Sequence, residues 1–249
     1  MINDIKTPYR KTAKREGVEQ QTEKFKNLPV FQDLADLRKK VLCILQNSNL
    51  SYVESMSLNY FLMQSQLNLR PAPILQITID EYNRLKNGEM LSSSKGKRGY
   101  KYKSHLKIDE NQITYLEEMI EFTYNTSPNF LFASAKNRIE NMNYFVKQTF
   151  KKLLECELIM PTQVRKIWET FIDESKISSK TKKLHLQQTR HSAEMAQKNY
   201  IAPPTQADML DLFDYYRTSL DENHNSCPPA KKRRKQQKPN DLNSELCML

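Results

Sequence analysis

The strongest constraint on the fold is a succession of segments whose apolar residues recur at helical spacing. Between positions 30 and 48, for example, Phe31, Leu34, Leu37 and Val41 repeat every three or four residues, as on one face of an amphipathic helix. Ser51 suits the N-cap of the next such segment, and either Thr78 or Asp80 suits the cap of a helix that stops near Gly88. In all, the pattern predicts helices near 31–48, 51–69, 79–88, 110–125, 137–157, 162–174, 186–201 and 205–220.

One stretch, residues 89–109, departs from this pattern. It alternates in places and has glycines at turn positions, which predicts two strands joined by a basic hairpin, with the second strand near Leu106–Ile108. Short apolar stretches at 74–78 and 129–134 are expected to be extended or edge segments. The predicted fold class is therefore mainly α with a small antiparallel β-sheet (α+β), in one domain spanning residues 29–218.

The two ends of the chain differ from this domain. Residues 1–28 are polar and basic with little periodicity, which predicts a flexible arm, and residues 219–249 are expected to be a disordered tail. The tail carries six basic residues between prolines, Lys231, Lys232, Arg233, Arg234, Lys235 and Lys238. Such a cluster is typical of a nuclear localisation signal, so we expect segment 229–239 to bind a nuclear import receptor and the protein to be nuclear. The alternative is a solvated tail that improves solubility.

Charge and glycine content narrow the function. The chain has 39 Lys and Arg against 29 Asp and Glu, a formal charge of +10, which favours an anionic partner, with nucleic acid first and an anionic membrane surface second. Only four glycines are present, and none forms a phosphate-binding loop motif, so any phosphate must be bound by side chains.

Several other classes of protein are disfavoured. The four cysteines are scattered and have no histidines nearby, so no zinc site, other metal site, cofactor site or disulfide framework is predicted. No apolar run reaches the roughly 18 residues of a membrane span, and the N-terminus does not resemble a secretory signal.

Five residues matter jointly. Arg70 lies where a helix is expected to meet an extended stretch, Lys95 lies in the basic hairpin, and Arg165 follows Thr162 by three residues. His191 and Ser192 precede Tyr200 by nine and eight residues. Each has an ordinary interpretation: a surface arginine, a solvated turn, an ion pair between Arg165 and Glu169 at i,i+4, and a helix that ends in a buried tyrosine.

In this order the five residues resemble the active site of the tyrosine recombinases, the family of phage integrases and chromosome-dimer resolvases. The stretches "LRPAPILQITIDEY", "SKGKRGY", "NFLFAS", "TQVRKIWETF" and "HSAEMAQKNY" are similar to segments of the eukaryotic Crypton-like branch, and the similarity covers about residues 30–205. The resemblance implies a tyrosine recombinase-like catalytic domain of mobile-element origin. Arg70, Lys95, Arg165, His191 and Tyr200 would be its catalytic residues.

Three positions depart from the usual family pattern. Thr162 stands in place of the first histidine of the His-x-x-Arg motif, Arg190 stands where glycine usually precedes the His-Ser pair, and Pro73 stands where an acidic residue often lies. Lys97 competes with Lys95 for the hairpin role, and the spacing to Tyr100 favours Lys95.

The resemblance also implies the reaction and the partners. Double-stranded DNA would be broken and rejoined through a 3′-phosphotyrosyl intermediate without a metal or cofactor. Its phosphates would be bound by Lys97, Arg98, Lys101, Lys103, Lys166 and Arg190. Helix 205–219 would either close its own core or dock on another copy on DNA.

The alternative function is a domesticated DNA-binding or chromatin-associated protein that keeps the fold but not the chemistry. The 28 residues of the N-terminal arm are too few for the separate clamp domain of an autonomous recombinase, which keeps this alternative open. A third interpretation is a helical nucleic-acid-binding protein unrelated to recombinases.

Overall fold

The computed structural model describes residues 29–93, 104–123, 129–133, 139, 141–154, 159, 161–189 and 205–222. This part of the chain is mainly helical and contains one two-stranded antiparallel sheet, as the sequence predicts. The elements are α2 (Phe31–Asn47), α3 (Tyr52–Leu67), α4 (Pro71–Leu75), α5 (Ile79–Lys86), β1 (Leu91–Ser93), β2 (Ser104–Leu106), α6 (Glu110–Thr123), α7 (Asn143–Leu153), α8 (Pro161–Glu174), α9 (Ser179–Thr189) and α11 (Gln206–Glu222).

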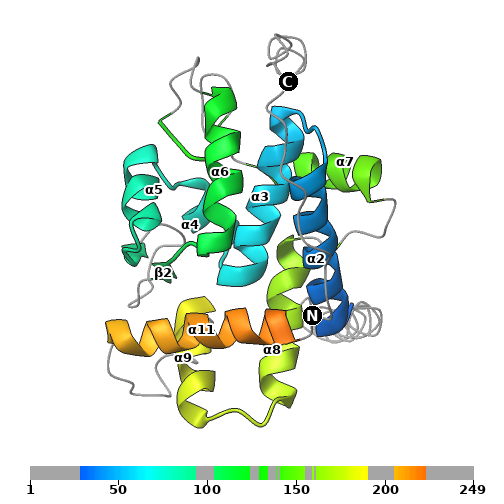
Figure 1. Cartoon of the computed structure of the whole chain (residues 1–249). Helices are drawn as coiled ribbons and strands as arrows, with labels where there is room; N and C mark the ends of the chain where they lie inside the picture. The colour runs from blue at the N-terminus through cyan, green and yellow to red at the C-terminus, as the bar shows by residue number, and fades with distance from the viewer. Residues whose placement is uncertain are drawn as a thin grey trace, which may run out of the picture.

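Helix α3 is the centre of the molecule. It packs against α2, α6, α7, α8 and α11, and it lies between α2 and α6 in Figure 1, with α11 crossing below them. Nearly every residue from Tyr52 to Leu67 is buried. A helix that is covered on all sides belongs to the core rather than to the surface. The other helices are therefore placed by what they bury against α3.

Polar side chains on α3 are buried too, and they fix its neighbours. Asn59 donates to the carbonyl of Tyr115 on α6 and accepts from Gln112 on the same helix. Ser65 accepts through its carbonyl from the indole nitrogen of Trp168 on α8, at 2.7 Å. Since a buried polar group without a partner is costly, these bonds select one arrangement of the helices around α3.

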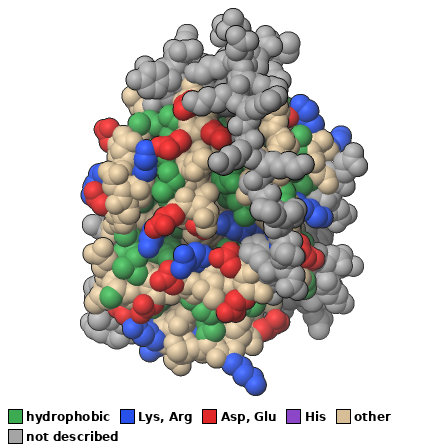
Figure 2. All heavy atoms as spheres, viewed as in Figure 1, with side chains coloured by type: hydrophobic (Ala, Val, Ile, Leu, Met, Phe, Trp, Pro, Cys, Tyr) green, Lys and Arg blue, Asp and Glu red, His purple; other side chains and the backbone are tan. Residues whose placement is uncertain are grey.

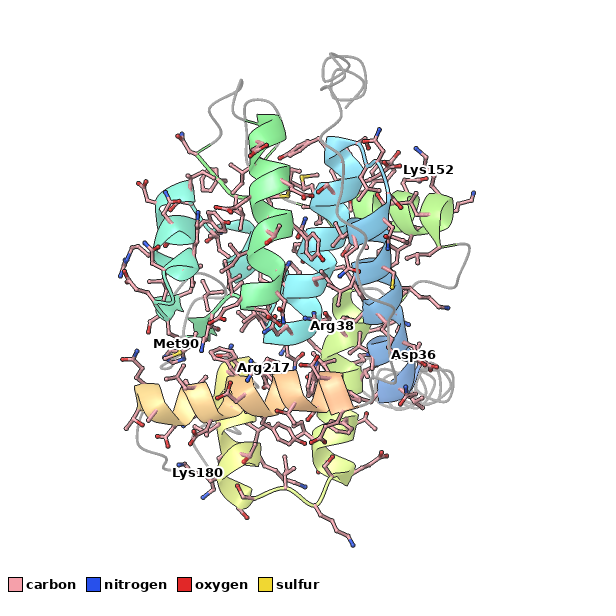
Figure 3. The ribbon with its side chains drawn as sticks, viewed as in Figure 1. Asp36, Arg38, Met90, Lys152, Lys180 and Arg217 are labelled. Carbon is pink, nitrogen blue, oxygen red and sulfur yellow. The ribbon has the colours of Figure 1, made fainter. Side chains whose placement is uncertain are left out.

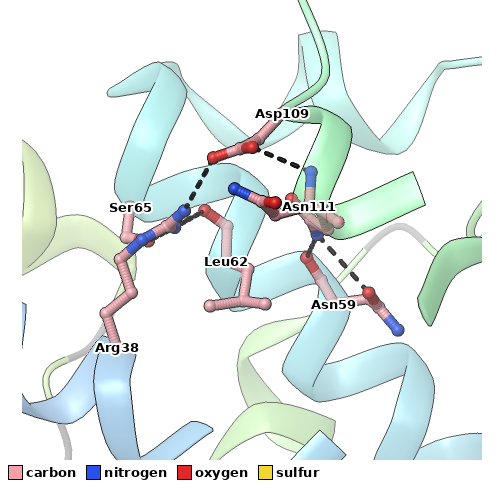
Figure 4. Close-up of polar contacts among 7 residues, drawn as sticks. Arg38, Asn59, Leu62, Ser65, Asp109 and Asn111 are labelled. Carbon is pink, nitrogen blue, oxygen red and sulfur yellow. Dashed lines mark hydrogen bonds and ion pairs between the residues drawn. The ribbon is translucent and has the colours of Figure 1, made fainter. Parts of the chain in front are cut away.

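Arg38 of α2 is a buried cation that joins three elements (Figure 4). Its Nη1 donates to the Leu62 carbonyl at 2.7 Å and to the Ser65 Oγ at 2.9 Å, and its Nη2 lies 3.7 Å from a carboxylate oxygen of Asp109, directly before α6. Burial lowers the pKa of Arg38, and the carboxylates of Asp109 and Asp221 oppose that shift. In Figure 3, Arg38 lies inside the molecule, whereas Lys152 and Lys180 project from its periphery. The contacts of Arg38 fix the orientation of α2 against α3 and the start of α6.

The helix caps follow the sequence closely. Ser51 caps α3 and Thr78 caps α5, and each forms a reciprocal capping box with the glutamate three residues later. Of the two capping residues proposed for α5, the structure therefore selects Thr78. The helix ends at Lys86, and Gly88 follows with a φ of +86°, a left-handed conformation that favours glycine.

Several expected boundaries were wrong. The extended stretch expected after Arg70, at 74–78, begins instead with the short helix α4 (Pro71–Leu75), because Pro71 suits the first helical position. The second strand spans 104–106 rather than 106–108, and α9 begins at Ser179, well before position 186. The segment near 129–134, expected to be a strand or an edge, contributes one isolated bridge, Phe130 to Thr78, and α11 ends at Glu222, two residues beyond the helix expected at 205–220.

Candidate active site

Arg165 joins α8 to the end of α9. Its side chain is 14% exposed, and its Nη2 donates to the carbonyl oxygen of Thr189, the last residue of α9, at 2.7 Å. The expected pair with Glu169 is present at 4.0 Å, the outer limit of an ion pair. The last carbonyls of a helix have no partner within that helix and carry partial negative charge, so a guanidinium is well suited to cap them.

The last turn of α9 also binds the small sheet. The side-chain amide of Gln188 makes two hydrogen bonds to the backbone of His105. It accepts from the His105 nitrogen at 2.9 Å and donates to the His105 carbonyl at 2.8 Å. The hydroxyl of Ser104 donates to the Gln188 carbonyl at 3.4 Å. The end of α9 is therefore held between α8 and β2.

This arrangement brings the ends of two candidate segments together. Ser93 pairs with Ser104, so the basic segment 94–103 leaves and re-enters the sheet beside Gln188. That segment contains five Lys or Arg and no acidic residue. The segment 190–204 continues directly from Thr189, the residue that Arg165 contacts.

Most of the predicted site residues lie in these two segments. The predicted catalytic residues Lys95, His191 and Tyr200 lie outside the described residues, as do Lys97, Arg98, Lys101, Lys103 and Arg190 of the predicted DNA-binding set. Their roles, and the helix expected to continue from Thr189 to Tyr200, stay predictions. Lys166, the remaining member of that set, is exposed on α8.

Arg70 occupies a tight corner after α3. It caps α4 with an extended backbone (φ −65°, ψ 154°), the conformation that a following proline favours. Its side chain is half-buried, and its Nε is buried without a hydrogen-bond partner among the described residues. Two residues earlier, Asn68 ends α3 in the left-handed region (φ 50°). The corner thus presents Arg70 at a fixed position with an unused donor.

A buried His–Tyr pair, which sequence reasoning missed, lies next to Arg165. The Nδ1 of His185 on α9 lies 2.7 Å from the hydroxyl of Tyr216 on α11, and both side chains are almost fully buried. Burial, and next the charge of Tyr215, raise the pKa of Tyr216 well above its usual value, while Asn68 and the cation of Arg165 oppose the shift. The sequence offers only a weak signal, a histidine between two leucines, because the two residues are 31 positions apart.

Helix α11 closes the core of its own chain. Met209, Leu212, Phe213, Tyr216 and Leu220 are at most 4% exposed, and the helix packs on α3 and α9. Of the two roles considered for segment 205–219, closing the core is the one that the structure contains. Docking on another copy stays a prediction.

The excess of positive charge lies outside the described residues. The described residues contain 17 Lys and Arg and 19 Asp and Glu, so the remaining 22 basic and 10 acidic residues account for the positive balance of the chain. Figure 2 accordingly shows acidic and basic side chains interspersed on the visible face of the described part. Most of the remaining basic residues lie in the three segments 1–28, 94–103 and 223–249.

The described residues also contain no group of three or more His, Cys, Asp and Glu arranged to hold a metal ion. None of the helices among them has the length and apolar character to cross a membrane. A comparison of the chain with protein-family models, with curated proteins and with solved structures found no match in any of the three.

Proposed function

We propose that this protein binds double-stranded DNA and breaks and rejoins a DNA strand through Tyr200, as a tyrosine recombinase-like enzyme. The observation that supports this most is the convergence at the end of α9. There Arg165 meets the residue that precedes Arg190 and His191, and Gln188 meets the strand that ends the basic segment 94–103.

In the proposed reaction the Tyr200 oxygen attacks phosphorus, and the bond from phosphorus to the 5′ oxygen breaks. The product is a 3′-phosphotyrosyl bond and a free 5′ hydroxyl, and attack by a 5′ hydroxyl reverses the step and rejoins the strand. Lys95 donates a proton to the leaving oxygen, and His191 accepts the tyrosine proton or hydrogen bonds the phosphate. Arg70 and Arg165 bind the non-bridging oxygens, where charge accumulates in the transition state.

A nicked DNA substrate tests this reaction. Short duplexes with randomised sequence around a single nick let the short fragment that carries the free 5′ hydroxyl diffuse away after cleavage, which traps the covalent adduct. We expect an adduct that survives denaturing electrophoresis and is absent in Tyr200→Phe. The proposal is wrong if wild-type protein binds these duplexes and forms no adduct in any sequence.

A second function, DNA binding without strand cleavage, is favoured by the contacts of Arg165. Its guanidinium caps α9 and pairs with Glu169, which is a structural role that needs no substrate. Binding with normal affinity but without adduct would support this alternative.

In either case we expect segment 229–239 to direct the protein to the nucleus. A fluorescent fusion in which the lysines and arginines of this segment are replaced would test it.

A further inference from the structure

Tyr216 contacts both helices that Arg165 joins. Its ring lies 4.6 Å from that of Trp168, which follows Arg165 by three residues on α8. Its hydroxyl lies 2.7 Å from Nδ1 of His185, one turn before Thr189 on α9. A single side chain from α11 is therefore in contact with α8 and with α9.

Two further hydrogen bonds connect His185 to the guanidinium of Arg165. The hydroxyl of Thr189 donates to the His185 carbonyl at 2.9 Å, and the Thr189 carbonyl accepts from Arg165. A displacement of His185 therefore moves the group that holds Arg165.

We propose that Tyr216 is a positioning residue, whose hydroxyl fixes α9 through His185 and so sets Arg165 for the phosphate. This inference rests on the proposed function for its chemical consequence. It differs from a purely structural role in its prediction, because removing one oxygen atom must change the geometry of the Arg165 guanidinium.

The test compares Tyr216→Phe with Tyr52→Phe in the full-length chain. Tyr52 is the matched control. Its hydroxyl is also buried, but it donates to the Ala133 carbonyl at 2.8 Å and not to a residue that contacts Arg165. At saturating nicked DNA we expect Tyr216→Phe to form adduct about tenfold more slowly or worse, because small displacements of positioned groups are costly. Its half-saturating DNA concentration and the rate of Tyr52→Phe should stay close to wild type.

Two variants at His185 distinguish the effect of its hydrogen bond to Tyr216 from the effect of its side-chain volume. His185→Gln keeps a side-chain hydrogen-bonding group for the Tyr216 hydroxyl and should retain most of the adduct rate. His185→Leu keeps bulk and loses that group, so it should resemble Tyr216→Phe. Equal rates in Tyr216→Phe and Tyr52→Phe would overturn the proposal.

A spectroscopic measurement keeps the test independent of strand cleavage. The Nε–H signal of Arg165, assigned through a lysine variant, should shift or broaden in Tyr216→Phe and not in Tyr52→Phe. If wild type forms no adduct and the signal responds, the proposed function fails and the positioning role stands. If the signal does not respond, the positioning role is wrong whatever the enzyme does.

Discussion

Among the single residues, Arg165 has one observed role and one proposed role for the same guanidinium. It caps the end of α9 through the Thr189 carbonyl, and it is the described member of the predicted catalytic set nearest in sequence to the segment that holds His191. A cap and a phosphate ligand are compatible because guanidinium has five N–H donors in a rigid fork. The question is how many of them remain available to DNA.

The variant Arg165→Met answers this. Methionine keeps an apolar stem and removes all donors, so the free energy of unfolding should fall by about 1 to 2 kcal/mol through the lost cap. If Arg165 also binds a phosphate, the slope of log affinity against log salt should decrease in magnitude by about 0.9. Urea unfolding and fluorescence anisotropy at several salt concentrations measure the two effects.

Lys166→Ala is the matched control for this pair of measurements. Lys166 is exposed on the same helix, one position further and on a different face. We expect it to change the salt slope with little effect on unfolding. If Arg165→Met is destabilised but keeps the wild-type salt slope, Arg165 is a cap only.

Among the elements, α11 is attached to the candidate site by a polar clamp at its first turn. Asp208 accepts from the backbone nitrogen and hydroxyl of Thr205 at 2.9 and 2.8 Å, and it pairs with Lys180 of α9 at 2.6 Å. The hydrogen bond from Lys180, and then those from Thr205, lower the pKa of Asp208 from its usual 3.8 to about 2. The clamp thus joins the helix that carries Tyr216 to the helix that carries His185.

This clamp should make stability depend on pH in a definite direction. The folded-state pKa of Asp208 is depressed, so its stabilisation is complete above about pH 4 and is lost as the pH falls towards 2. Asp208→Asn should therefore unfold at lower urea than wild type at pH 7, and the difference should shrink between pH 4 and pH 2. Urea midpoints measured across this range test it.

The partner residue provides the control. Lys180→Gln removes the largest cause of the shift, so the pH dependence below pH 4 should weaken while the Thr205 contacts remain. Because both groups are at the surface, added salt should reduce the effect of either substitution. A difference between wild type and Asp208→Asn that is the same at pH 2 and pH 7 would contradict the assignment.

In the molecule as a whole, the net positive charge lies in other parts of the chain than the described helices. The described helical part is nearly neutral, and the positive balance comes from segments attached to it. Sequence-independent affinity for DNA depends on the number of phosphates neutralised, so these segments should supply most of it. The core would then contribute position and chemistry rather than attraction.

A truncated chain of residues 29–222 tests this division. It keeps 26 basic and 23 acidic residues, against 39 and 29 in the full chain. We expect the same thermal unfolding midpoint, because the buried contacts of the core lie within this range, and a weaker, less salt-dependent affinity for duplex DNA. Removing residues 1–28 and residues 223–249 separately shows how much of the DNA affinity each end contributes. Full-length affinity and salt slope in the truncated chain would show that residues 29–222, which keep the basic segment 94–103, bind DNA without the two ends.

The elements that could be predicted from the sequence are those whose causes are local. Helical spacing predicted α2, α3, α6, α7, α8 and α11, Ser51 and Thr78 supplied caps, and the one alternating stretch predicted the hairpin. Where two local preferences compete, as at Pro71, the prediction was wrong. Propensity and capping act within a few residues, which is why they can be read along the chain.

The contacts between elements could not be predicted in this way. The pairing of His185 with Tyr216, the cap of α9 by Arg165 and the contact of Gln188 with His105 join residues 24 to 83 positions apart. Nothing in the local pattern at either end specifies these partners, because they follow from how α8, α9 and α11 bury their apolar faces against one another and α3. The order of residues set which side chains can do chemistry, and packing around α3 set which of them come together.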